Sequence, residues 1–125
     1  MTRVARWMRR LAIAGVVLCF TVVSLGAYVR LTAAGLGCPD WPGCYGHLTP
    51  SGAAATVLPA AGASLPAAAS RPYEAGKAWR EMIHRYAAAT LGLTIVLIAA
   101  LALVTRRQHL VSVPLALALC AIVLV

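Results

Sequence analysis

Charged residues are scarce in this chain, and acidic residues are nearly absent. Only 11% of the 125 residues are charged, and Asp and Glu together number three. Soluble domains carry about 25% charged residues, so a chain that is 62% hydrophobic is not expected to keep a soluble surface hydrated. Aromatic residues are also few, at 6%, while Ala and Leu are abundant, which favours helices over a membrane barrel. The composition predicts an all-α, polytopic transmembrane helical bundle.

The shortage of acids leaves a formal net charge of +8. A basic chain can bind nucleic acid when its charges gather into a groove or along one face. Here the arginines flank apolar runs instead: Arg3, Arg6, Arg9 and Arg10 precede the first run, and Arg106 and Arg107 follow the second. This is the pattern of residues that stay in the cytoplasm during membrane insertion. We therefore expect the lipid bilayer, and no nucleic acid, as a partner.

Three apolar segments organise the chain. Residues 11–29 and 86–104 contain no charge, and at about 1.5 Å per helical residue each run can cross a hydrocarbon core of about 30 Å. The third segment is shorter and lacks a flanking anchor, so it is interpreted as a cut helix. The predicted organisation is a basic N-terminus (1–10), a first transmembrane helix (11–29), an outer loop (30–80), a second helix (81–104), a cytoplasmic turn (105–109) and a truncated third helix (110–125).

The charge pattern also predicts the orientation. Both ends of the hairpin made by the first two spans should face the cytoplasm of a cell membrane, which places the loop between them on the outer, periplasmic side. A cleaved signal peptide is the alternative for the first span, but its apolar run exceeds the usual length of about 7–15 residues and no A-x-A site closes it. Residues 53–70 are Ala-rich with interspersed prolines, and are interpreted as a linker without chemistry.

The four cysteines fall into two groups. Cys19 and Cys120 lie in apolar runs, where a thiol is usually a small buried hydrophobic group. Cys38 and Cys44 lie in the predicted outer loop, where oxidation is permitted. A disulfide closing so short a loop would contribute roughly 2–2.5 kcal/mol in the chain-entropy model. A structural disulfide, a redox-active pair and, less well matched in spacing, a zinc site that includes His47 remain open on the residues alone.

A second group of polar residues stands where the chain re-enters the membrane, in the stretch WREMIHRYAA. Glu81 and His84 are three residues apart and share a helical face. A histidine at this depth needs a partner or an interior position, and imidazole is a common axial ligand of haem iron. Arg80 and Arg85 could pair with carboxylates, including haem propionates. The alternative is that Trp79 and these four residues simply anchor the helix at the membrane interface.

Together these stretches resemble the haem A synthase family. YVRLTAAGLGCPDWPGCYG (28–46) is similar to its V-R-L-T-x-x-G-L and C-P-D-W-P-x-C motifs, and EMIHRYAAATLGL (81–93) is similar to its E-x-I-H-R motif. The resemblance covers the amino-terminal part of the family only. It implies an eight-helix protein of two similar halves that oxidises a methyl group of haem O to the formyl group of haem A, for assembly of terminal respiratory oxidases.

The resemblance also implies roles for single residues. His84 would be an axial ligand of the haem in the first half, which is haem O as substrate, while a permanent haem b is expected in the second half. Glu81 would be the catalytic residue near the reacting edge. Cys38 and Cys44 would form a disulfide or redox pair that covers the site or passes electrons. No metal other than haem iron is expected.

The chain also departs from the family. The second histidine of the first half is missing, and His109 cannot replace it because it lies on the predicted cytoplasmic side. The linker also looks longer than usual. We therefore expect the chain alone to be inactive and to need the remaining helices of the synthase or another subunit. Two alternatives stay open: a membrane thiol–disulfide oxidoreductase and a non-enzymatic haem-binding hairpin.

Overall fold

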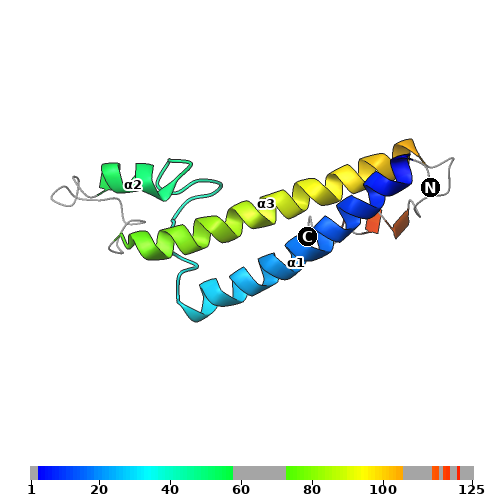
Figure 1. The fold of residues 1–125 in the computed structure, drawn as a ribbon. Helices are drawn as coiled ribbons and strands as arrows, with labels where there is room; N and C mark the ends of the chain where they lie inside the picture. Colours follow the sequence, from blue (N-terminus) through cyan, green and yellow to red (C-terminus); the bar gives the residue numbers. More distant parts are fainter. Residues whose placement is uncertain (1–2, 58–72, 106–113, 116, 119–120, 122–125) are drawn as a thin grey trace. The chain divides into compact units, whose positions relative to one another are not determined.

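The computed structural model describes residues 3–57, 73–105, 114–115, 117–118 and 121. These residues form three helices, α1 (Arg3–Leu31), α2 (Pro50–Val57) and α3 (Ala75–Val104), and include no strand (Figure 1). The predicted all-α class is confirmed. The predicted turn (105–109) and third helix (110–125) lie mostly outside the described residues, and the five described positions beyond Thr105 have helical backbone.

Helices α1 and α3 have the length and composition of membrane spans. They contain 29 and 30 residues, with mean hydropathies of 2.2 and 2.5 over their most apolar stretches. Only 6% and 17% of those stretches are buried, so neither helix is the core helix of a soluble domain. Large apolar side chains such as Phe20 (79% exposed) point away from the protein. The length and exposed apolar faces of these helices support a membrane protein, because lipid can cover such faces.

Helix α1 ends in a well-formed C-terminal cap. The Ala33 N–H donates to the Arg30 carbonyl (3.1 Å), and the Ala34 N–H donates to the Val29 carbonyl (2.9 Å). Ala33 adopts φ = 50°, the left-handed conformation that a Schellman motif requires. Val29 and Ala34 are both buried, which supplies the apolar contact that usually accompanies this motif. The chain therefore leaves α1 in a fixed direction toward the cysteine loop.

The chain divides into two compact units, and each contains parts of α1 and α3. In the first, Met1–Val22 with Ala87–Val125, the two helices run antiparallel. Met8 packs on Ala99 and Ala102, and Gly15 faces Thr94 and Ile98. Small residues at these positions let the helices approach closely, as in other membrane helix pairs.

The second unit, Val23–Tyr86, contains the end of α1, the cysteine loop, α2 and the start of α3. Its buried cluster consists of Cys38, Cys44, Ala53, Ala78 and Met82. Two partly buried tyrosines, Tyr45 and Tyr73, pack against this cluster and meet edge to face with ring centroids 5.8 Å apart. The cysteine loop is thus part of a packed core and not an isolated turn.

Helix α2 corrects the linker prediction for residues 53–57, which are helical. The Gly52 N–H donates to the Thr49 hydroxyl (3.4 Å), and Pro50 occupies the first helical position, where its fixed φ is favourable. The buried Ala53 then joins the core of the unit. Pro50 begins this helix, while Pro59 and Pro66 of the predicted linker lie outside the described residues. Residues 58–70 of the predicted linker lie outside the described residues.

Candidate functional site

The centre of the candidate site is the loop closed by Cys38 and Cys44. Their sulfurs form a disulfide, and the two Cα atoms are 4.8 Å apart. Both cysteines are buried. Just after the disulfide, Cys44 and His47 exchange backbone hydrogen bonds of 2.7 and 3.1 Å, which fold the chain back on itself. The pairing of Cys38 with Cys44 that the family resemblance implied is therefore present in the structure.

Asp40 organises the inside of this loop. Its carboxylate accepts hydrogen bonds from the backbone N–H groups of Tyr45 (2.5 Å) and Gly46 (2.8 Å), both of which have positive φ. Burial by itself raises the pKa of the Asp40 carboxyl, but these hydrogen bonds and the positive charge of Arg85 outweigh it and hold the pKa below its usual value. Asp40 therefore acts as an ionised acceptor that fixes the turn.

The loop lies directly on helix α3, and Gly37 makes this approach possible. A Cβ atom at Gly37 would stand 2.8 Å from the Ala78 backbone nitrogen, which is closer than real Cβ atoms come. The Cys38 sulfur is also 4.0 Å from the Ala78 carbonyl oxygen. Only glycine allows the two backbones to come this close at residue 37 without a shift.

Glu81 joins the loop to α3. It is 6% exposed, and its Oε2 accepts a 3.0 Å hydrogen bond from the Cys38 N–H. Its Oε1 forms an ion pair with Arg85 Nη2 at 2.5 Å, one helical turn further along α3. A buried carboxylate needs such compensation, because an unpaired charge would be costly. Glu81 therefore reaches the disulfide through the backbone of Cys38.

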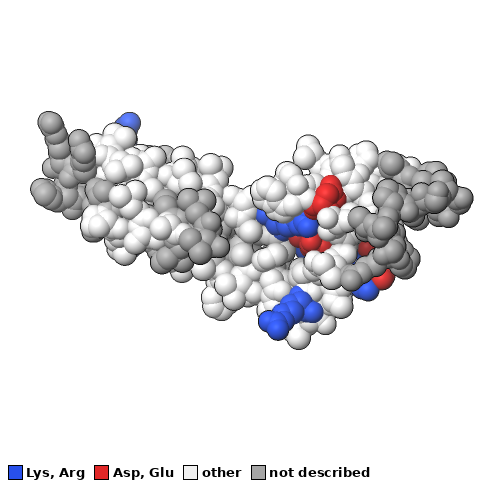
Figure 2. All heavy atoms as spheres, turned by 180° about the vertical axis from the view of Figure 1, so that it is seen from behind, with Lys and Arg blue, Asp and Glu red and all other residues white. Residues whose placement is uncertain are grey.

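Arg85 completes the attachment. Besides Glu81, its guanidinium donates to the carbonyl oxygens of Asp40 (2.6 Å), Gly43 (2.7 Å) and Cys38 (3.4 Å). Five N–H donors in a rigid plane suit this set of acceptors. We call Glu81, Arg85 and these three carbonyls the loop clamp. On the face shown in Figure 2, acidic and basic surfaces adjoin, and every acidic residue of the sequence lies in this unit.

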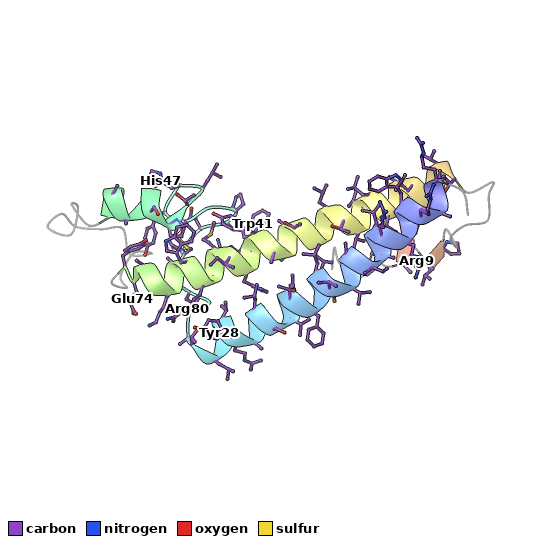
Figure 3. The ribbon with its side chains drawn as sticks, in the orientation of Figure 1. Arg9, Tyr28, Trp41, His47, Glu74 and Arg80 are labelled. Carbon is purple, nitrogen blue, oxygen red and sulfur yellow. A yellow bond between two sulfur atoms is a disulfide. The ribbon has the colours of Figure 1, made fainter. Side chains whose placement is uncertain are left out.

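Arg80, the other candidate propionate contact, lies elsewhere on the helix. Its guanidinium is 5.7 Å from the centre of the Tyr28 ring of α1 (Figure 3), within the range of a cation–π contact. The two arginines proposed for one task therefore have different surroundings: Arg85 bonds to the loop, and Arg80 stacks on α1.

His84 is a residue of α3, and its imidazole packs against Gly26 of α1. A Cβ atom at Gly26 would be 3.0 Å from His84 Cε1 and 3.4 Å from Nε2, so glycine leaves the room that the imidazole fills. The Nδ1 atom of His84 is buried and has no hydrogen-bond partner. A buried polar atom without a partner is rare and costly. An imidazole held between helices can ligate haem iron through one of its ring nitrogens, so the surroundings of His84 fit a haem ligand.

Comparison with known proteins identifies the family. The model of the cytochrome oxidase assembly protein family matches residues 9–125. This chain belongs to that family. It is also 44% identical over 96 residues to a protein of Shewanella oneidensis named heme A synthase. That alignment covers 74% of this chain and 26% of the relative, so the chain spans about a quarter of the relative's length. No solved structure matches the chain.

The family assignment confirms the resemblance inferred from the two motifs, and the structure brings those motifs together. Cys38, Cys44, Glu81 and Arg85 meet in the loop clamp and disulfide, while His84 and Arg80 face α1. His109 and Cys120 lie outside the described residues. Cys19, expected to be buried, is exposed on α1, as is normal for an apolar residue on a lipid-facing helix.

Two members of the site were missed by sequence reasoning. Asp40 stands between prolines in a turn, and aspartate there commonly bonds to nearby backbone N–H groups, so the signal was present. Gly26 lies in an uncharged apolar run, and no local pattern distinguishes it from Gly15 of the same helix. Its role follows only from the position of His84 on another helix.

Proposed function

We propose that this chain supplies the disulfide loop and one haem-binding histidine of a haem A synthase, which converts a methyl group of haem O to the formyl group of haem A. The family, and the relative named heme A synthase, support this reaction class. The observation that carries the proposal is His84, which packs against Gly26 of α1 with its Nδ1 buried and unpartnered, one helical turn along α3 from Glu81. The haem is the substrate, and conversion of its methyl to a formyl group removes four electrons, which an oxidant from outside this chain must accept.

Each residue then has a distinct task. His84 is the axial ligand of haem O, and a permanent haem b belongs to the part of the synthase that this chain does not cover. Glu81 stabilises charge near the reacting edge, with its carboxylate held by Arg85 and the Cys38 N–H. Arg85 is bonded to four acceptors, so Arg80 is the better candidate for a propionate contact. The loop covers the site on the outer face, with the N-terminus in the cytoplasm.

The burial of the disulfide argues against the main alternative, a membrane thiol–disulfide oxidoreductase. A thiol–disulfide oxidoreductase needs a sulfur that an attacking thiolate can reach. Cys38 is only 4% exposed and Cys44 is fully buried, and the loop clamp fixes the backbone around them. These features favour a structural lid over a cycling dithiol. A haem-binding hairpin without activity remains the second alternative, and it shares the same His84 ligand.

Expression in cells that make haem O but no haem A tests the proposal. The chain spans about a quarter of its relative, so we expect no haem A when it is expressed alone, and haem A when the remaining helices of the relative are supplied on a second polypeptide. His84→Ala should abolish both bound haem and product, while His47→Ala, which removes a loop imidazole, should retain bound haem. Unchanged haem binding by His84→Ala would refute the ligand assignment. Haem bound without product in the completed pair would support the hairpin alternative.

A further inference from the structure

A second group of polar residues lies at the beginning of α1, in the unit that does not contain the disulfide. Arg3, Arg6, Trp7 and Arg10 together line a cavity of about 330 Å³ on the protein surface. Their spacing of three and four residues places them on one helical face. Arg9, in the same turn, does not line the cavity, and Figure 3 shows where it lies on α1.

This unit contains no Asp or Glu side chain that could neutralise these arginines. The three acidic residues of the sequence are Asp40, Glu74 and Glu81, and all lie within Val23–Tyr86. The two ion pairs among the described residues use Glu74 and Glu81 with Lys77 and Arg85. Like charges three or four residues apart on a helix repel one another. An anion from outside the chain would remove that repulsion.

Trp7 forms one wall of the cavity and contacts Arg10. Its ring is 56% exposed, and the Arg10 guanidinium lies 5.6 Å from the ring centre. This contact limits the freedom of Arg10 and holds its donors beside those of Arg3 and Arg6. Guanidinium groups bind phosphate oxygens in pairs, and tryptophan is enriched at the level of lipid headgroups. The cavity therefore combines one aromatic ring with three guanidinium groups, a combination suited to a phosphate at the membrane surface.

We propose that this cavity binds the phosphate of an anionic phospholipid headgroup. The uncharged run of α1 begins at Leu11, directly after Arg10, so the arginines stand where the hydrocarbon core meets the headgroups. A lipid held there by its phosphate can lay its acyl chains along the exposed apolar face of α1, where Ile13, Val16 and Val17 are all more than half exposed. Inorganic phosphate offers the same oxygens but none of this apolar contact.

Lipid retention by the purified 125-residue chain tests this inference. The chain is equilibrated in neutral detergent with phosphatidylglycerol or phosphatidylcholine, and bound lipid is counted by native mass spectrometry. We expect phosphatidylglycerol to be retained, and Arg6→Gln to weaken its binding about tenfold, as expected for the loss of a charge-assisted hydrogen bond. Arg9→Gln removes the same charge from the same turn and should change binding less than about twofold, because Arg9 does not line the cavity.

Further measurements distinguish binding at a specific site from general electrostatic attraction to the arginines. Trp7→Phe keeps every charge but removes the larger ring beneath Arg10, and it should weaken phosphatidylglycerol binding several-fold while helical circular dichroism is retained. Equal losses in Arg6→Gln and Arg9→Gln would overturn the proposal in favour of diffuse attraction. Equal retention of phosphatidylcholine, or displacement of the lipid by millimolar inorganic phosphate, would also overturn it. None of these outcomes depends on haem, so the inference stands or fails separately from the proposed activity.

Discussion

At the scale of single residues, Arg85 has the largest set of partners in the candidate site. It bonds to one carboxylate and three backbone carbonyls, and each bond to a charged donor contributes about 1.5–3 kcal/mol. A lysine has one ammonium group and cannot span this set in the same geometry. The consequence is a loop whose position depends on one side chain of α3.

Replacing Arg85 with lysine should therefore loosen the loop. We expect Arg85→Lys to cost roughly 2–3 kcal/mol of local stability, and to speed reduction of the Cys38–Cys44 disulfide by a small phosphine at least tenfold. Arg80→Lys is the matched control, because Arg80 stacks on Tyr28 and does not touch the loop. Similar reduction rates in the two variants would show that Arg85 does not hold the loop.

Gly26 gives a second test at this scale. In Gly26→Ala the new methyl group would meet His84 Cε1 at 3.0 Å, so the imidazole must move by a few tenths of an ångström. If His84 ligates haem, the optical and electron paramagnetic resonance spectra of the bound haem should shift. Gly15→Ala, whose Cβ would make ordinary contact with Thr94 Cγ2 at 3.8 Å, should leave them unchanged. Identical spectra in the wild type and Gly26→Ala would contradict the placement of the ring beside Gly26.

At the scale of elements, the cysteine loop combines a covalent closure with an ionised acceptor. The folded-state pKa of Asp40 lies below its ordinary value of 3.8. Its contribution to stability is therefore fully present above about pH 3.8, and is lost as the pH falls through the lower, folded-state pKa. Neutral and mildly acidic conditions should leave the turn intact.

Nuclear magnetic resonance can follow this titration directly. The amide signals of Tyr45 and Gly46, which donate to Asp40, should stay constant from pH 7 to pH 5 and change with a midpoint below 3.8. Asp40→Asn keeps an acceptor oxygen without the charge and should abolish the titration. A midpoint above 3.8 in the wild type would show that the hydrogen bonds and Arg85 do not overcome burial.

The long helices were predictable from sequence because their signal is local. Uncharged runs of sufficient length indicate spans whatever surrounds them, and α1 and α3 contain both predicted runs. The start of α3 at Ala75 and the existence of α2 were not predicted. Helix α2 is short and Ala-rich, and its stability depends on packing of Ala53 and on the Tyr73 hydroxyl, which donates to the Pro50 carbonyl (2.7 Å). Such contacts join residues far apart in sequence.

In the candidate site, too, the sequence predicts what is local but not the contacts between residues far apart in the chain. The spacing of Glu81 and His84 predicts neighbouring positions on one helix, but Glu81 contacts the cysteine loop and His84 contacts Gly26 of α1. The contact of Glu81 with the Cys38 N–H could not be predicted, because it crosses 43 positions of sequence. Arg85 was expected to face a ligand, and its bonds to loop carbonyls emerge only when the loop is folded onto α3.

At the scale of the whole molecule, charge is divided unequally between the two units. The Val23–Tyr86 unit holds every acidic residue and uses two of them in ion pairs. The other unit holds arginines alone, at residues 3, 6, 9, 10, 106 and 107. Glu74 and Glu81 of the Val23–Tyr86 unit pair with basic residues of that same unit, whereas the arginines of the other unit call for the membrane surface. This division agrees with the family assignment and with the proposed lipid contact.

The loop clamp has a consequence for how this segment can vary among related proteins. Arg85 contacts the loop through carbonyl oxygens, and every amino acid carries that atom. Trp41, whose side chain is 80% exposed, could therefore be exchanged without changing what the guanidinium binds. Gly43 could not, because a Cβ there would lie 2.5 Å from the His47 carbonyl oxygen. The attachment therefore constrains the path of the loop backbone more than the identity of its side chains.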